Sequence, residues 1–176
     1  KDAYLFRKVD YQQGLSNSAV LCLYQDKAGL MWFGTYDGVN CYDGKGIEVF
    51  RSDFSMKKTL SNNVIHSIQQ ADSSCLWITT HLGVNRFSQD SRQVVGYYDF
   101  TGDYYLHSNP KGDTWVVSNE GIFYYNTYHK KFVHLKNIET PVENMDHRAF
   151  VTDDGVLWTF PRNTGSLIQC SLDGFD

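Results

Sequence analysis

Residues 29–43 read GLMWFGTYDGVNCYD, and the chain repeats this stretch. A step of 45 positions carries Trp32 onto Trp77, and the same step carries four other residues onto identical ones: Leu15 to Leu60, Thr35 to Thr80, Gly38 to Gly83 and Asn40 to Asn85. A third copy centres on Trp115 and a fourth on Trp158, so all four tryptophans occupy one repeat position. A period of roughly 40 to 45 residues indicates a repeat architecture.

The composition of the 176 residues is that of a folded domain. The 12 Tyr, 11 Phe and 4 Trp can supply a large buried apolar area. The net charge of −4 is spread without blocks of like sign, which argues against a nucleic-acid surface and a polybasic membrane patch. No apolar run approaches the length of a membrane span, and no signal-peptide pattern begins at Lys1. We therefore expect no nucleic-acid partner and no direct membrane contact.

Each repeat contains short runs of strand-forming residues separated by turn residues. The runs predict four antiparallel strands per repeat, within residues 19–51, 64–99 and 104–136. A fourth unit, within residues 148–171, has three strands and lacks its outer one. One isolated strand, at about residues 4–9, precedes the first repeat.

Four-stranded units at this period, each with a Trp and a Gly turn, predict an all-β fold, namely the blades of a β-propeller formed by residues 1–176. A sandwich would not need the same Trp and Gly in every unit. The expected strand at 4–9 would close a ring by pairing with the third strand of its last blade. Two outcomes stay open: a ring of four blades, or the first part of a longer ring whose open edges seek partners.

Two segments carry a family resemblance. Residues 15–44 (LSNSAVLCLYQDKAGLMWFGTYDGVNCYDG) and 60–87 (LSNNVIHSIQQADSSCLWITTHLGVNRF) resemble the repeat of the two-component regulator propellers. The third unit keeps Trp115 and Gly121 without the Leu-Ser-Asn segment, and the fourth keeps residues 154–158 and departs after Phe160.

The resemblance implies a location and a role. Such repeats form the periplasmic sensor region of hybrid two-component systems in gut Bacteroidetes, typically as two seven-bladed propellers ahead of a membrane helix and a histidine kinase. It implies a segment that senses an oligosaccharide in the periplasm, has no enzymatic activity of its own and needs no cofactor. The rest of the sensor propeller would be its partner.

The most repeated residues have structural explanations. Asp26, Asp72 and Asp154 occupy turns between first and second strands, where an Asp side chain can bond local backbone. The tryptophans are expected in the core between neighbouring blades. The cysteines, Cys22, Cys41, Cys75 and Cys170, show no metal or redox spacing and are interpreted as free thiols, with a disulfide in an oxidising compartment as the alternative.

Catalytic and metal motifs are lacking in the sequence. The six histidines form no H-x-x-x-H or H-E-x-x-H pattern, so no zinc site is expected. The acidic segment Asp153-Asp154-Gly155 lacks the alternating ligands of a calcium loop. There is no nucleophile elbow and no S-x-x-K motif. Paired glycosidase carboxylates leave little local signature, so a propeller enzyme acting on glycans stays open as a minor alternative.

The loops that join second to third strands are the candidate ligand-binding surface. Strands that alternate in direction bring these loops to one face of the disc, where a fixed Gly stands beside variable residues on a rigid scaffold. The candidate binding residues are Tyr36, Asp37, His81, Asn119, Glu120, Arg162 and Asn163. The leading hypothesis is an oligosaccharide sensor; the alternative is a propeller that binds another chain, including a second copy of itself, through its edges or disc face.

Overall fold

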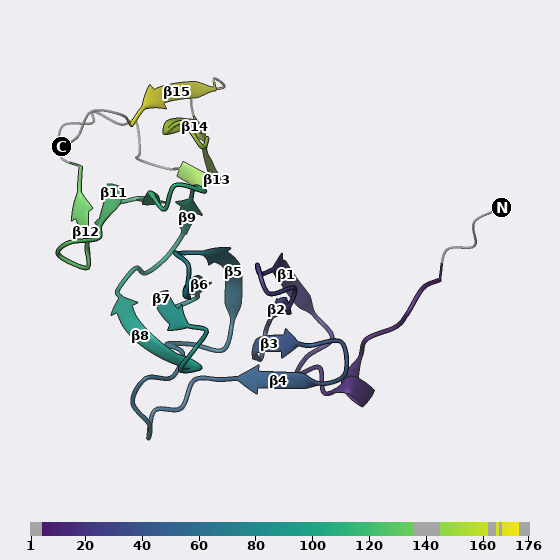
Figure 1. Ribbon diagram of the computed structural model, residues 1–176. Coiled ribbons are helices and arrows are strands. Elements are labelled where there is room, and N and C mark those ends of the chain that lie inside the picture. The colour runs from purple at the N-terminus through teal and green to yellow at the C-terminus, as the bar shows by residue number, and fades with distance from the viewer. Residues whose placement is uncertain (1–4, 136–144, 162–164, 166, 173–176) are drawn as a thin grey trace.

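The computed structural model describes residues 5–135, 145–161, 165 and 167–172, and its regular structure there is almost entirely β-strand (Figure 1). One 3-10 turn, η1 (Tyr11–Gln13), precedes the strands, with Asp10 accepting at its N-cap. The strands form three four-stranded sheets and one three-stranded sheet, and every pairing is antiparallel. The predicted all-β fold of propeller-type blades is confirmed.

The strands follow one another within each sheet in chain order. The first blade contains β1 (Val20–Gln25), β2 (Met31–Thr35), β3 (Gly38–Tyr42) and β4 (Ile47–Phe50). The second contains β5 (Ile65–Gln70), β6 (Cys75–Thr80), β7 (Gly83–Ser88) and β8 (Gln93–Tyr98). The third contains β9 (Tyr104–Ser108), β10 (Thr114–Ser118), β11 (Gly121–Asn126) and β12 (Lys131–His134), and the fourth contains β13 (Met145–Val151), β14 (Val156–Pro161) and β15 (Ile168–Ser171).

The four blades stand side by side as an open arc (Figure 1). The first strands contact one another in sequence, β1 with β5, β5 with β9 and β9 with β13. They therefore form the inner side of the arc, and β4, β8 and β12 lie outermost. Because the first and last blades lie apart, the alternative of a closed ring of four blades is wrong for this structure.

The strand expected at residues 4–9 is not formed over the described residues 5–9. Leu5 and Phe6 are almost fully exposed there. The expected partner was the third strand of the last blade, β15, which lies at the far end of the arc from the N-terminus (Figure 1). A strand needs a neighbour to satisfy its backbone groups, and an open arc brings none to this segment. Its pairing in a larger ring stays a prediction.

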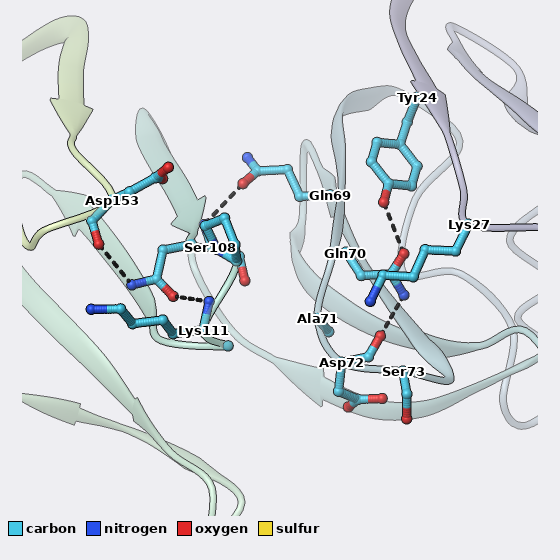
Figure 2. Close-up of a pocket in the computed structure, with 13 residues that line it drawn as sticks. Tyr24, Lys27, Gln69, Gln70, Ala71, Asp72, Ser73, Ser108, Lys111 and Asp153 are labelled. Atoms are coloured by element: carbon cyan, nitrogen blue, oxygen red, sulfur yellow. Dashed lines mark hydrogen bonds between the residues drawn. The ribbon is translucent and has the colours of Figure 1, made fainter.

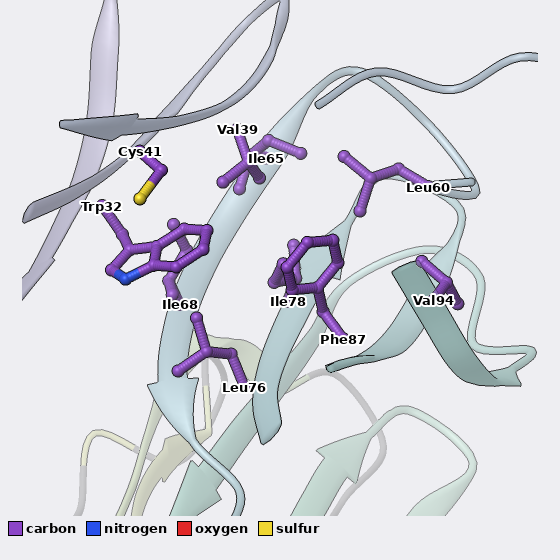
Figure 3. Close-up of a cluster of buried hydrophobic side chains, with 10 residues drawn as sticks. All are labelled: Trp32, Val39, Cys41, Leu60, Ile65, Ile68, Leu76, Ile78, Phe87 and Val94. Carbon is purple, nitrogen blue, oxygen red and sulfur yellow. The ribbon is translucent and has the colours of Figure 1, made fainter. Parts of the chain in front are cut away.

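Neighbouring blades are joined by the repeated tryptophan. Trp32 is fully buried between the first and second blades, with its ring centroid 5.8 Å from that of Phe87 (Figure 3). Val39 of the first blade and Ile68 and Leu76 of the second belong to the same buried cluster. Burying such side chains contributes roughly 1.5–3 kcal/mol each. The predicted core role is confirmed for this residue.

The next two interfaces repeat the arrangement. Trp77 packs 4.8 Å from Tyr125 of the third blade, and Trp115 clusters with Val151 and Leu157 of the fourth. Trp158 is only half-buried. The three tryptophans that precede another described blade are thus buried, whereas the one in the last described blade is not.

A polar network explains why Ser, Thr and Asn recur with the tryptophan. In the second blade Asn85 accepts from the Ser61 amide at 3.0 Å and donates to the Ser61 hydroxyl at 2.8 Å, and that hydroxyl lies 2.9 Å from Thr80 Oγ1. In the first blade Ser16, Thr35 and Asn40 repeat these bonds. Because the groups are buried or nearly so, each bond made here avoids the cost of an unpaired polar group. The network fixes how the chain enters the first strand of each of these blades.

One face of the first blade is not covered by a neighbouring blade, whereas the same face of the second blade is. Val20 and Leu23 are 39% and 65% exposed, whereas Ile65 and Ile68, the residues 45 positions later, are 0% and 5% exposed. In the second blade this face is covered by Trp32 and Val39. The first blade therefore presents an apolar surface of the kind that another blade covers.

Candidate ligand pocket on the turn face

The loops predicted to bind ligand join the second and third strands of each blade, and their residues differ in exposure. Tyr36 is exposed, whereas Asp37 is held by Arg51 in a two-point ion pair, with nitrogen–oxygen distances of 2.9 and 3.2 Å. This pair ties the β2–β3 loop to the end of β4. The Asp37 carboxylate is therefore already partly used in an ion pair within its own blade.

The remaining loop residues are spread over different blades. His81 is exposed, with its ring 5.9 Å from that of His66. Asn119 and Glu120 are exposed in the β10–β11 turn. Arg162 and Asn163 lie outside the described residues. None of the predicted residues that the structure describes lines the depressions described below, and the role of all seven in ligand binding stays a prediction.

A depression of about 630 Å³ opens instead on the opposite face, among the turns between first and second strands (Figure 2). We call it the turn-face pocket. It is lined by residues 69–73 of the second blade and 108–112 of the third, by Tyr24 and Lys27 of the first, and by Asp153 of the fourth. Side chains from all four described blades thus meet at one place.

Asn109 builds the wall that the third blade contributes. Its Oδ1 accepts from the amides of Lys111 and Asp113 at 3.0 and 2.9 Å, which folds residues 109–113 into a tight turn. Gly112 completes the turn with a φ of +95°, a value that favours glycine. Asn109 Nδ2 donates to the Asp153 main-chain carbonyl at 3.2 Å, so the same side chain also joins the fourth blade.

Two glutamines join the first, second and third blades beneath the pocket. Gln69 donates to the Leu106 carbonyl at 2.7 Å and accepts from the Ser108 amide at 2.9 Å. Gln70 accepts from the Tyr24 hydroxyl at 2.8 Å and donates to the main chain of its own turn at Asp72. These amides are used within the protein, so they position the pocket walls.

A chain of hydrogen bonds runs from the core to the pocket. Trp77 Nε1 donates to Thr114 Oγ1 at 3.1 Å, and Thr114 Oγ1 donates to Ser108 Oγ at 3.0 Å. Thr114 Oγ1 also lies 3.5 Å from the Gly112 carbonyl, and the shorter contact to Ser108 is the better bond for its single proton. Among the described residues no acceptor receives a hydrogen bond from the Ser108 hydroxyl, so this hydroxyl can donate to a ligand in the pocket.

The charged groups of the pocket differ in how they are paired. Asp72 is paired with Arg86, and its Oδ1 accepts from the Ser74 amide. Within the described parts of the chain, the exposed ammonium groups of Lys27 and Lys111 form no ion pair. The pocket therefore contains two cations that are available to a ligand.

Asp153 brings a carboxylate to the rim, 3.6 Å from Nε2 of His107. Burial lowers the pKa of the His107 imidazole from its ordinary value of 6.5, against the opposing effect of Asp153. The ring stacks on Trp115 at 6.2 Å and lies tilted against Phe150 at 5.7 Å. At neutral pH this histidine is uncharged, so the Asp153 charge at the rim is not neutralised by it.

Two further depressions adjoin the pocket on the same face. One, of about 410 Å³, shares Lys27 and Gln70 with it, and another, of about 360 Å³, shares Asp72 and Lys111. Together they form a furrow with a mixed polar and apolar lining across the turns of successive blades. A ligand longer than the central pocket could extend along it.

Potential metal ligands and thiols are dispersed among the described residues. There, no group of three or more His, Cys, Asp or Glu side chains is placed to hold a metal ion. All four cysteines are free, and burial raises the pKa of the Cys22 thiol to about 11. No described helix has the length and hydropathy that crossing a membrane requires.

Sequence reasoning missed the pocket because its turns were explained by backbone bonding alone. Asp72 and Asn109 do hold turns, as expected for this position. The sequence did contain a signal for the pocket: the residues beside these Asp and Asn side chains vary between blades, and Lys27 and Lys111 stand in turns of different sequence. What brings these turns together is the stacking of blades, which no single repeat displays.

Comparisons with known proteins agree with the repeat and the fold. Residues 14–37 match the family described as two component regulator propeller. A 50-residue segment is 38% identical to a protein named histidine kinase P4 from Formosa agariphila, covering 28% of this chain and 4% of that protein.

Solved structures share the architecture over most of the chain. The extracellular domain of a putative hybrid two component system from B. thetaiotaomicron has a TM-score of 0.75 at 24% identity, covering 98% of this chain and 27% of the other. The extracellular domain of a putative one component system from the same organism has a TM-score of 0.66 at 18% identity, covering 86% and 21%. This chain thus spans less than a third of either relative. It carries a two-component regulator propeller repeat on the propeller fold that these extracellular domains share.

Proposed function

We propose that this chain is a ligand-sensing segment of a hybrid two-component sensor, that it lies in the periplasm as part of an inner-membrane protein, and that its ligand is an oligosaccharide. The observation that carries the proposal is the fold shared with an extracellular two-component domain over 98% of the chain. The matching repeat at residues 14–37 and the histidine kinase relative support it.

The turn-face pocket supports an oligosaccharide as the ligand class. Its polar groups are held by turns of stacked blades, which is a rigid arrangement suited to recognising hydroxyl groups. The furrow on either side gives room for more than one sugar unit. In this proposal the chain only binds, and phosphoryl transfer belongs to a histidine kinase elsewhere in the sensor.

Signalling then requires that the ligand bind one arrangement of the sensor better than another. The pocket is built from four blades, so a bound ligand would contact several blades at once. Such a ligand would favour the arrangement of the sensor in which the turns that line the pocket lie closest together. The switching element in this proposal is consequently an interface between packed units, because a packed blade interior deforms little.

The test is a titration of the 176-residue chain with a panel of oligosaccharides, followed by calorimetry and thermal shift. We expect heat and a raised unfolding temperature for at least one class, because a ligand that binds only the folded state stabilises it. A chain that shows folded-state circular dichroism and no response to any class would refute the proposal.

A second candidate function is protein interaction, and one observation favours it. The exposed apolar face of the first blade forms a depression of about 480 Å³ lined by Val20, Leu21, Leu23 and Phe33. Clustered exposed apolar side chains commonly mark interaction surfaces. A second copy of this chain is one partner for that face, and the association it predicts is tested below.

A further inference from the structure

The polar groups around the turn-face pocket fall into two sets, those used within the protein and those left for a ligand. The side-chain acceptors of Gln69, Gln70 and Asn109 already receive protons from protein donors. The donors left over are the Ser108 hydroxyl and the ammonium groups of Lys27 and Lys111, and one carboxylate, that of Asp153, is also exposed at the rim. A site that offers donors and cations suits a ligand rich in acceptors and negative charge.

We propose that the pocket binds an acidic oligosaccharide through its carboxylate or sulfate groups, with Ser108, Lys27 and Lys111 as the donors. This inference rests on the proposed function and makes it specific by naming the ligand chemistry and the face. The three donors come from the first and third blades, and Figure 2 draws Lys27 and Lys111 on opposite sides of the pocket, so one oligosaccharide would contact two blades that are not adjacent in the chain.

The hydroxyl of Ser108 is the best-positioned of the three donors. The bond from Thr114 occupies one lone pair on its oxygen, and Thr114 is itself polarised by the Trp77 indole N–H. Consecutive bonds in one direction strengthen each other, which makes the last hydroxyl a better donor. The bond received from Thr114 distinguishes this hydroxyl from that of an ordinary surface serine.

Asp153 sets a limit on anion binding and offers a sharp test. Its exposed carboxylate stands at the rim of the same pocket and repels a negative ligand. The Asp153→Asn substitution removes that charge and keeps the main-chain carbonyl to which Asn109 donates. We expect this variant to bind acidic oligosaccharides more tightly and neutral ones unchanged, a gain that damage to folding could not produce.

The experiment is calorimetric titration of the 176-residue chain at low ionic strength with four probes: a trigalacturonate, a sulfated disaccharide, a neutral cellotriose and sodium sulfate. We expect an acidic oligosaccharide to bind at least about tenfold more tightly than the neutral one, with an affinity that falls as salt is added. The carboxylate and sulfate probes show which anionic group the site prefers.

Single substitutions test which residues bind the acidic probe. Ser108→Ala and Lys111→Ala should each weaken the acidic probe by roughly tenfold or more, because each removes a bond to a charged group. Lys57→Ala is the matched control, since it removes one exposed positive charge from the segment before β5, on the other face. We expect the control to leave the affinity unchanged.

The outcomes separate the two proposals. Equal affinity for neutral and acidic probes, or an equal loss in Lys57→Ala and Lys111→Ala, overturns the anion site and leaves saccharide sensing standing. Binding of sodium sulfate alone, or of nothing, by the folded chain rejects an acidic oligosaccharide as the ligand of this pocket. If a wider panel also gave no response, the proposed function itself would fail.

Discussion

At the scale of single residues, Gly34 shows how closely the first two blades approach. A Cβ added there would lie 2.3 Å from Cys22 Sγ and 2.6 Å from Ile65 Cγ2. Cys22 belongs to the neighbouring strand of the same blade, and Ile65 to the first strand of the next. The position thus has no space for a side chain, although its backbone is that of an ordinary strand.

The Gly34→Ala substitution should therefore destabilise the fold, by roughly 1–3 kcal/mol, because an overpacked core forces its neighbours to move. Urea unfolding followed by tryptophan fluorescence measures the effect. Gly46→Ala is the control, since nothing lies within 4 Å of its added Cβ. Equal midpoints for the two variants would show that the blades separate easily at this point.

His107 predicts a dependence of stability on pH. Because burial places its folded-state pKa below 6.5, the unfolded chain takes up a proton first as the pH falls. The stabilisation from the neutral ring is present above about pH 6.5 and is lost as the pH falls toward the folded-state pKa. We expect the His107→Gln variant to lose part of the pH dependence of the unfolding midpoint between pH 7 and 5. An identical slope in both proteins would contradict this.

At the scale of elements, the second strand of each blade carries the connection to the next blade. Trp77 does this with its ring, against Tyr125 and Phe132, and with its N–H, toward Thr114. Trp158 occupies the equivalent position and is only half-buried. The same residue type at the same place in the repeat therefore contributes unequally, depending on whether another blade covers it.

The Trp77→Phe substitution should lower the free energy of unfolding by roughly 1–3 kcal/mol, through the lost hydrogen bond and the cavity left beside Tyr125. The matched control is Trp158→Phe, which we expect to cost clearly less. Thermal unfolding followed by circular dichroism compares the two. A larger loss for Trp158→Phe would mean that the last described blade is better packed than its exposure indicates.

At the scale of the whole molecule, the open arc leaves an apolar blade face and a half-buried tryptophan at opposite ends. Surfaces that differ and complement each other favour head-to-tail association. We expect the 176-residue chain to form concentration-dependent oligomers in analytical ultracentrifugation. Leu23→Asp should abolish them, whereas Tyr128→Asp, at another exposed position, should not. A monomer at high concentration would remove the support for a protein-interaction role.

Much of the fold was predictable because each repeat is defined by residues that lie near one another in the chain. The step from Trp32 to Trp77 indicated equivalent strands, and the predicted family resemblance is confirmed by the match at residues 14–37. The Asp and Asn turns could be predicted because their side chains bond backbone groups only a few residues away. The pocket could not, because residues from four blades line it.

The sequence by itself determined the repeat, the strands of the four blades and the burial of Trp32, Trp77 and Trp115, since these depend on spacing and on bonds between residues near in the chain. Only the tertiary structure decided that the blades form an open arc, that residues 5–9 find no partner there, and that Lys27, Ser108 and Lys111 share one pocket. The physical reason is that blade stacking sets distances between residues far apart in sequence, and a repeat pattern does not encode how many blades complete the ring.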